Sequence, residues 1–290
     1  MRKLFAVPLI FLFILAGCQK DGNVVTSQDN NSLSKNGGEK VTMRHNGHLI
    51  GVGVNAMDAH FALGDQEVVT ASDLASDFTD VQKSPYKWFF YNDETNPATG
   101  NDYGIDNSLG SFVDGPGTPP YGSGSAQISV SGTQRRNLAT YQFSGTPLAD
   151  ITVLAFSTYN PSAGNGGSVN RSGYLNFNVD FNGTDTWQKR LIFTPPSGSV
   201  IQDQWQEWDC IDGGNALWHY SGSTWPGTST PGSTTKTWSQ ILSEYPGVRI
   251  RVTDPWLGIR VGAPYSDGYT ENIDGFKFGT TYTKTFDFEN

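Results

Sequence analysis

Tryptophan is the residue type that most clearly indicates binding chemistry, because six of the eight tryptophans lie in the last third of the chain. A flat indole ring can stack on the C–H face of a sugar, and it also carries one N–H donor. Trp208 lies three residues after Trp205, so in a strand the two rings face opposite ways. Trp218, Tyr220 and Trp225 lie among Gly, Ser and Thr, where loops are expected. We therefore expect Trp208 and these three residues to line a ligand surface, the alternative being that they belong to the core.

Arginine side chains gather in a second stretch, nearer the carboxyl end of the chain. Arg249 and Arg251 alternate with apolar residues over 248–252, which places both guanidiniums on the polar face of one strand. Arg260 follows on another expected strand. A guanidinium pairs with a carboxylate or a sulfate through two hydrogen bonds, so this cluster predicts an anionic sugar as ligand. The alternative is salt bridging to the many acidic residues of the chain.

Glu207 and Asp209 are the residues that support an enzymatic alternative. Alternation along a strand puts them on one face, and retaining glycosidases need two carboxyl groups about 5–5.5 Å apart. A polysaccharide lyase would instead need a tyrosine, a histidine and a cation, for which His219, Tyr220 and Arg249 are the candidates. The chain contains neither a G-x-S-x-G nor an H-E-x-x-H motif.

Composition and periodicity predict the elements that must position these side chains. Glycine accounts for 34 of the 290 residues while Lys and Glu are few, which is typical of a β protein with many turns. The clearest strand runs from Tyr174 to Phe181, where apolar residues alternate with Asn and Asp, so one face should be buried and the other wet. Further strands are expected at residues 86–91, 126–130, 138–143, 151–159, 187–193, 248–252, 257–261, 273–278 and 282–288.

A single helix is expected among these strands. Trp238, Ile241 and Leu242 fall on one stripe of a helical period, and Thr237 with Gln240 fits a capping box at its start. Many strands with one short helix indicate an all-β fold. We therefore predict an antiparallel β-sandwich of the jelly-roll type with one short helix.

The first residues of the chain indicate export and anchoring. A basic start precedes an apolar run of fourteen residues from Leu4 to Gly17, which fits a secretory signal and is too short to span a bilayer. Leu15-Ala16-Gly17-Cys18 resembles the lipobox of bacterial lipoproteins. That resemblance implies a signal peptide at 1–17 and a lipid on Cys18. Because Gln19 rather than Asp follows, it also implies the outer membrane, with exposure at the cell surface as an open alternative.

Two further segments follow the expected lipid. Residues 18–40 are rich in Gly, Ser and Asn with almost nothing apolar, so a flexible tether is expected. Residues 41–290 have the length of one β-sandwich, with the core at about 74–290. The stretch from 45 to 73 fits either an added hairpin or an ordered edge of the same domain.

Net charge and cysteine number narrow the classes of partner. Removal of residues 1–17 leaves 28 acidic and 17 basic side chains, a formal charge of −11. Such a balance argues against nucleic acid as a partner and against a basic lipid-binding face, so the Cys18 lipid is the only membrane contact expected. Only Cys210 then remains, so no internal disulfide can form, and we expect this thiol to be a small buried hydrophobe.

Several motifs resemble jelly-roll carbohydrate-binding modules of the galactose-binding-like class. They are Asp77-Phe78-Thr79-Asp80 with Tyr86-Lys87-Trp88, the glycine-rich approach at 122–128, and the ending at 271–279. In that class a structural calcium often joins the first and last strands, and the resemblance places it on Asp77, Asp80 and Asp274. Calcium takes six to eight oxygen ligands, which acidic side chains supply.

Together these observations predict a surface-tethered lipoprotein that binds a glycan or polysaccharide without catalysis. The main alternative is a polysaccharide lyase or glycoside hydrolase on the same fold. A structural or adhesive surface protein is the third possibility, because a fold by itself does not determine a function.

Overall fold

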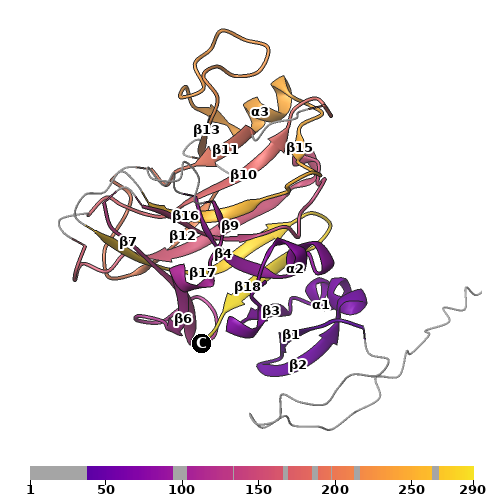
Figure 1. The fold of residues 1–290 in the computed structure, drawn as a ribbon, viewed down its shortest axis with the longest axis vertical. Helices are drawn as coiled ribbons and strands as arrows, with labels where there is room; N and C mark the ends of the chain where they lie inside the picture. The colour runs from indigo at the N-terminus through magenta and orange to yellow at the C-terminus, as the bar shows by residue number, and fades with distance from the viewer. Residues whose placement is uncertain are drawn as a thin grey trace, which may run out of the picture. The chain divides into compact units, whose positions relative to one another are not determined.

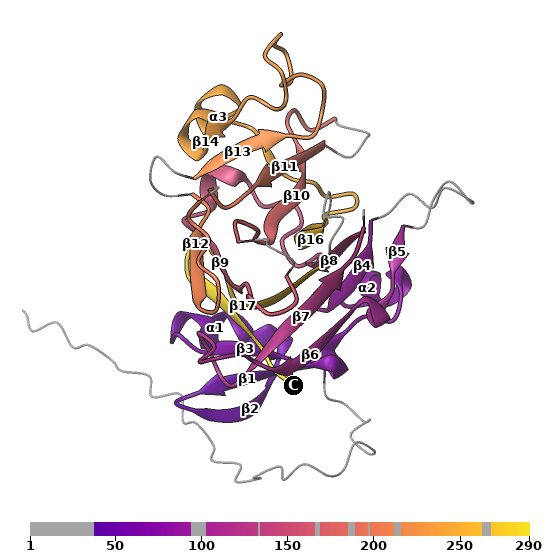
Figure 2. The same cartoon turned by 90° about the vertical axis from the view of Figure 1, so that its left-hand side faces the viewer.

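The structure, a computed structural model, describes residues 38–93, 103–132, 134–165, 169–184, 189–196, 198–211, 216–262 and 268–290. Residues Gly38–Asn290 form one compact unit. The expected signal peptide, the lipidation site at Cys18 and most of the expected tether lie outside the described residues. Within those residues the strands form two nine-stranded sheets (Figures 1 and 2), and no helix is long and apolar enough to cross a membrane.

The first sheet combines strands from the start, the middle and the end of the chain. Its order is β12–β9–β17–β18–β3–β1–β2, and β7 pairs with the first half of β17 and carries β6 on its other side. Neighbours run antiparallel except β18 and β3, which are parallel. Its strands are β1 (Lys40–His45), β2 (His48–Gly53), β3 (Gln66–Val69), β6 (Gly110–Asp114), β7 (Gly124–Val130), β9 (Val153–Tyr159), β12 (Trp205–Asp209), β17 (Tyr269–Gly279) and β18 (Thr283–Phe288).

The second sheet is antiparallel and lies against the first. Its order is β14–β13–β11–β10–β16–β8–β4–β5, and β15 pairs with β10 beyond the end of β16. Its strands are β4 (Trp88–Asn92), β5 (Gly104–Ile105), β8 (Arg135–Thr140), β10 (Tyr174–Asp180), β11 (Lys189–Phe193), β13 (Leu217–Tyr220), β14 (Lys236–Thr237), β15 (Arg249–Ile250) and β16 (Leu257–Gly262).

Short helices connect and cover the sheets. The α-helices are α1 (Met57–Ala62), α2 (Phe78–Lys83) and α3 (Trp238–Glu244), and the 3-10 helices are η1 (Val54–Ala56), η2 (Ala71–Asp73), η3 (Asn107–Leu109) and η4 (Leu148–Asp150). Figures 1 and 2 place α3 and β13 at one end of this unit, and the β1–β2 hairpin with α1 at the other end.

The main core lies between the two sheets and is rich in aromatic rings. From the second sheet, Trp88 on β4 is fully buried. Its ring packs edge-to-face against Phe276, Phe286 and Phe288 of the first sheet, at centroid distances of 5.7, 5.2 and 5.0 Å. Such offset contacts add to the hydrophobic gain of burial. The predicted all-β sandwich is confirmed.

Periodicity located most of the central strands. β10 begins at the expected Tyr174, and Leu175, Phe177 and Val179 join the main core as alternation requires. Its polar face differs from the prediction, because Asn176 and Asn178 are also fully buried rather than wet. The strand expected over 248–252 is limited to the two residues of β15.

Two of the three α-helices in the described part of the chain were not predicted. α3 has the expected capping box, in which Thr237 accepts from the Gln240 N–H and Gln240 accepts from the Thr237 N–H. α1 and α2 are each six residues long, which is too short for a helical period to stand out in the sequence. Asp77 caps α2, and Val81 is buried beneath it.

The uncertain N-terminal stretch is both a hairpin and an edge of the first sheet. β1 and β2 are joined by Asn46 and Gly47, whose φ values of 49° and 80° fit a two-residue hairpin turn. β3 then inserts between β1 and the last strand, β18. Met43, Val52, Met57 and Phe61 form a small core of their own under this hairpin.

Candidate ligand-binding face

The four aromatic residues expected on a ligand surface lie in the core instead. Trp218 and Trp225 are 0% exposed, and Trp208 and Tyr220 are 7% exposed. The three indole N–H groups donate to Thr158 Oγ1, the Cys210 carbonyl and the Thr234 carbonyl, at 2.7 to 2.8 Å. Burial with satisfied donors marks these rings as packing residues, so the predicted stacking surface was wrong for them.

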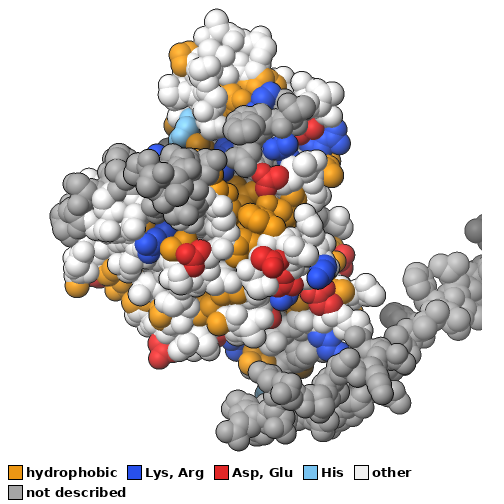
Figure 3. Space-filling model, in the orientation of Figure 1, with side chains coloured by type: hydrophobic (Ala, Val, Ile, Leu, Met, Phe, Trp, Pro, Cys, Tyr) orange, Lys and Arg blue, Asp and Glu red, His pale blue; other side chains and the backbone are white. Residues whose placement is uncertain are grey.

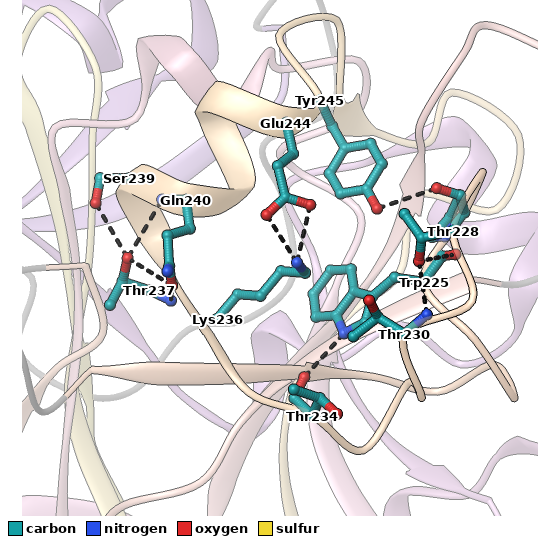
Figure 4. A network of polar contacts seen from close by, with 11 residues as sticks. Trp225, Thr228, Thr230, Thr234, Lys236, Thr237, Ser239, Gln240, Glu244 and Tyr245 are labelled. Atoms are coloured by element: carbon teal, nitrogen blue, oxygen red, sulfur yellow. Dashed lines mark hydrogen bonds and ion pairs between the residues drawn. The ribbon is translucent and has the colours of Figure 1, made fainter.

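Trp225 shows why a Gly, Ser and Thr-rich loop misled the prediction. Figure 4 shows the side chains of Lys236 and Tyr245 next to its ring. The Tyr245 ring stacks on it at 6.0 Å, and the Lys236 ammonium lies 5.2 Å from the ring centroid. Lys236 also pairs with Glu244 at 2.7 Å. Tyr245, directly after α3, and Lys236 of β14 therefore cover the loop, a non-local contact that local composition does not reveal.

Glu207 and Asp209 do share the exposed face of β12, as alternation predicts. They line a cleft of about 350 Å³ with Lys277 of β17. Glu207 Oε2 accepts from Lys277 Nζ, so a lysine neutralises one carboxylate of the expected pair. Trp205 lies on the same side and donates to the Pro116 carbonyl at 2.8 Å, while Trp208 points into the core.

The expected lyase group is not assembled around one point. His219 and Tyr220 are neighbours on β13, so their side chains project to opposite faces of the sheet. Tyr220 is buried in the core, and His219 pairs in register with Ile192 of β11 on the other face. Burial lowers the pKa of His219. Cys210 is fully buried, as expected, and burial raises the pKa of its thiol well above its usual range.

Each of the three expected calcium ligands accepts hydrogen bonds from backbone N–H groups. Asp77 accepts from the Asp80 N–H at 2.8 Å, and Asp80 accepts from the Ser76 N–H at 3.0 Å. Asp274 is fully buried at a bulge in β17, where it accepts from the Tyr121 and Phe288 N–H groups at 3.1 and 3.0 Å. These carboxylates do not form one donor group. Among the described residues, His45, His60 and Asp65 are the group of three whose donor atoms meet.

The outer face of the second sheet, turned away from the main core, gathers a different set of polar side chains. On β10, Asn178 pairs in register with Arg190 of β11, and Tyr174 pairs with Arg260 of β16. Arg260 in turn pairs with Asn137 of β8. Paired residues of antiparallel strands project to the same side, so the register places two arginines on one face, on either side of β10.

These arginines converge on one carboxylate and one indole. Asp93 Oδ2 accepts from Arg190 Nη1 at 2.7 Å and also from Arg260 Nη2. The Arg190 guanidinium lies 4.7 Å from the centroid of the Trp256 ring, and the Arg260 guanidinium lies 5.9 Å from it. We call Asp93, Asn178, Arg190, Trp256 and Arg260 the arginine face. Burial lowers the pKa of Arg260 to about 10, because desolvation disfavours its charged form.

Amide side chains hold the two guanidiniums in place. Arg260 Nε donates to Asn137 Oδ1 at 3.0 Å, and Arg190 Nε donates to Asn178 Oδ1 at 3.3 Å. Asn178 Nδ2 donates in turn to Asp254 Oδ2 at 2.9 Å. Asp254 has a φ of 54°, a left-handed conformation that is uncommon for a residue with a side chain. The arginine face is thus organised by contacts within the protein.

An aromatic patch continues the arginine face toward α2. Phe89, Tyr91 and Trp256 belong to a second apolar cluster, separate from the main core, and Tyr141 packs against it. Phe78 of α2, 38% exposed, lies 6.3 Å from the ring centroid of Tyr141. Figure 3 shows hydrophobic side chains gathered at the surface between the positions of α2 and β10, with acidic side chains beside them.

Three buried polar atoms in or beside this face have no hydrogen-bond partner among the described residues. They are the Trp256 Nε1 and Arg249 Nε donors and the Asn176 Oδ1 acceptor. Leaving such a group unpaired costs about 1–3 kcal/mol, so buried polar atoms normally have partners. The Arg190 side chain is 13% exposed within this face, and the half-buried Tyr174 and His219 border it.

Of the three arginines singled out from the sequence, Arg260 belongs to this face, and Arg249 and Arg251 lie beside it. Arg249 pairs in register with Asp180 of β10, and the Arg251 N–H donates to the Asn178 carbonyl at 3.1 Å. Arg251 is 6% exposed and Arg249 is half-buried. Sequence reasoning missed Arg190 and Trp256. Arg190 alternates with the core residue Leu191 in an expected strand, which was a usable signal for its outward position.

Comparison with known proteins gives no match: the chain resembles no protein-family model, no curated protein and no solved structure closely enough to be matched.

Proposed function

We propose that the chain binds an acidic polysaccharide, without turning it over, through the arginine face. The observation that carries this proposal is the convergence of Arg190 and Arg260 on the Trp256 ring. Guanidinium groups recognise carboxylates and sulfates through paired hydrogen bonds. Trp256 is 2% exposed, so its ring supports the guanidiniums from below, and the apolar contact with a sugar would come from Phe78, 38% exposed, in the adjoining aromatic patch.

The state of the enzymatic candidates supports binding rather than turnover. The Lys277 ammonium pairs with Glu207, and His219 and Tyr220 project to opposite faces of β13. A retaining glycosidase needs two carboxyl groups free for their roles, and a lyase needs its base and acid around one sugar. Neither arrangement is met by these residues.

The proposal includes the anchoring that the first residues indicate. A lipid on Cys18 would hold the chain at the outer membrane, and residues 18–40 would act as a tether of about 25 Å root-mean-square reach. The binding domain would then meet polymers outside the lipid layer. The lipid is proposed as its only membrane contact.

Affinity electrophoresis tests the proposal. The full chain is run through gels that contain a polyuronate, a sulfated polysaccharide or a neutral glucan, and we expect retardation only in the acidic gels. Arg190→Gln should weaken binding about tenfold, since a hydrogen bond to a charged group contributes about 1.5–3 kcal/mol. The affinity of Arg190→Lys should lie between those of Arg190→Gln and the unchanged chain, because lysine keeps the positive charge but lacks the planar guanidinium that makes two parallel hydrogen bonds.

Lys83→Gln is the matched control, since Lys83 is an exposed cation at the end of α2. It should bind like the unchanged chain. Equal retardation by the neutral glucan, or unchanged retardation of Arg190→Gln, would contradict the proposal. Release of reducing ends that Glu207→Gln abolishes would instead assign a hydrolase, and release of unsaturated uronates that His219→Ala abolishes would assign a lyase.

A further inference from the structure

Two histidines and one aspartate from three separate segments meet beside the β1–β2 hairpin. His45 ends β1, His60 lies in α1, and Asp65 directly precedes β3. Their imidazole nitrogens and carboxylate oxygens lie within 4.8 Å of one another. This group is remote in sequence from every residue of the arginine face, and the glycan proposal does not use it.

The end of α1 brings His60 and Asp65 together. The Asp65 N–H donates to the His60 carbonyl at 3.1 Å, and the Gly64 N–H donates to the Phe61 carbonyl at 2.9 Å. These two bonds form a Schellman motif, which needs a left-handed residue, and Gly64 has a φ of 87°. The motif turns the chain so that the Asp65 side chain returns to the imidazole of His60.

The three side chains point their donor atoms at one place. His60 Nδ1 lies 2.7 Å from Asp65 Oδ2, and His45 Nδ1 lies 2.8 Å from Asp65 Oδ1 and 2.9 Å from Oδ2. The imidazole rings stand perpendicular, with centroids 6.0 Å apart. Asp65 is 6% exposed, whereas the side chains of His45 and His60 are 39% and 25% exposed. The carboxylate thus forms the floor of a shallow site whose two walls are imidazoles.

Asn46 supplies the outer contact that metal-binding histidines usually have. Its Nδ2 lies 3.0 Å from His45 Nε2, the ring nitrogen that faces away from Asp65. In this orientation the amide donates to Nε2, and after a half-turn its oxygen would accept from Nε2–H, the second-shell hydrogen bond that fixes the ring and tautomer of a metal-bound histidine. The left-handed φ of 49° at Asn46 holds its side chain at the hairpin turn, next to the ring.

We propose that His45, His60 and Asp65 bind one Zn²⁺ ion through the two Nδ1 atoms and a carboxylate oxygen. Two imidazoles with one carboxylate match the ligand preference of zinc, and Mg²⁺ or Ca²⁺ would prefer an all-oxygen set. Tetrahedral zinc needs a fourth ligand, which the partly exposed side of the site leaves to water or to a donor group of a partner. Coordination through His45 Nδ1 places the ring proton on Nε2. The Asn46 amide oxygen can accept a hydrogen bond from this Nε2–H once the amide group has rotated by a half-turn.

A metal ion at this position would connect three segments around the smallest apolar cluster of the domain and so stabilise it. The cluster of Met43, Val52, Met57 and Phe61 has only four buried members, and the hairpin that covers it pairs through β1 with β3. Cys210, the free cysteine of the described part, is buried elsewhere and cannot bridge these segments. Small cores commonly depend on a metal or a disulfide for their stability.

Zinc titration of the full chain, without a polyhistidine tag and after treatment with a chelator, tests the site. Calorimetry with ZnCl₂ should give one site per chain. The same addition should raise Tm, because a ligand that binds only the folded state stabilises it. Co²⁺ in place of Zn²⁺ should give the visible absorption bands of a four-coordinate site. These three readouts require no variant.

Asp65→Asn and His60→Gln keep the approximate size of the side chain and remove a proposed zinc ligand. Each should weaken zinc binding at least about 100-fold, because loss of an outer-shell partner alone typically costs about 10–100-fold. His48→Ala is the control, since His48 is an exposed histidine on the same hairpin outside the group. It should bind zinc like the unchanged chain. Absence of stoichiometric binding in the unchanged chain, or loss of binding in His48→Ala with retention in Asp65→Asn, would overturn the proposal.

Discussion

Asn178 links the charged and the aromatic parts of the arginine face. The side-chain Oδ1 of Asn178 accepts from Arg190 Nε, and its side-chain Nδ2 donates to the Asp254 carboxylate. Its backbone N–H donates to the Trp256 carbonyl at 2.9 Å. The Asn178 side chain thus holds a guanidinium and a carboxylate in fixed relation, and its backbone N–H bonds to the backbone of Trp256. A face ordered in this way loses little side-chain entropy when a ligand binds.

Glu271 allows a prediction about pH, because it is fully buried in the core and its Oε1 accepts from Ser172 Oγ at 3.1 Å. Burial raises the pKa of this carboxyl from 4.5 to about 8. Between those two values the folded chain holds a proton that the unfolded chain has released. The free energy of unfolding should therefore fall as pH rises through this window, by up to about 1.4 kcal/mol per pH unit for one group.

Urea unfolding at a series of pH values checks this effect. Glu271→Gln keeps the neutral shape and should make the decline of stability with pH shallower by that one-proton contribution. Glu244→Gln, at an exposed glutamate of α3, should leave the slope as it is. Identical slopes for the Glu271→Gln and unchanged chains would show that Glu271 is ionised in the folded state.

At the residue scale, the limits of sequence reasoning are clearest for two tryptophans. Trp225 looked exposed because its neighbours are Gly, Ser and Thr, but Tyr245 and Lys236 cover it. Trp256 was not singled out from the sequence, and its ring lies on the outer face of the second sheet against Arg190. Both differences come from contacts between distant segments, which local composition does not contain.

At the element scale, alternation identified one side of each central strand reliably. Leu175, Phe177 and Val179 occupy the core as their period of two requires. The same period labels Asn176 and Asn178 as wet, although both are buried on the outer face. Alternation separates apolar from polar faces, and it carries no information on whether another segment covers the polar one.

The bulge in β17 provides a prediction at this scale. Gly275 has a φ of 62°, and β17 shifts register against β9 between Asp274 and Lys277. A Cβ atom on Gly275 would lie 3.1 Å from the Tyr121 ring. Gly275→Ala should lower the free energy of unfolding by about 1–2 kcal/mol, since left-handed backbone is unfavourable for residues with a side chain. Thermal unfolding would detect this as a lower Tm.

Gly51→Ala is the matched control in another strand of the same sheet. A Cβ atom there would meet only Lys40 Cδ, at 4.0 Å. Its Tm should stay unchanged or rise slightly, because alanine restricts the unfolded chain more than glycine does. Equal losses at both positions would mean that the bulge has no special need for glycine.

At the scale of the whole molecule, the two proposed sites belong to different parts of the fold. The arginine face is built on β10, β11 and β16 of the second sheet, and the histidine group lies beside the hairpin that extends the first sheet. Changes at distant sites without shared partners usually act additively. Loss of zinc binding should therefore leave glycan binding intact, and Arg190→Gln should leave zinc binding intact.

The most direct test of the central claim compares two forms of one ligand by calorimetry. An oligouronate is titrated into the full chain, and so is the same oligosaccharide after its carboxyl groups have been reduced to alcohols. If Arg190 and Arg260 recognise the charge, the acidic form should bind and its reduced form should bind at least about tenfold more weakly. Equal affinity for the two forms would contradict an arginine face that selects acidic glycans.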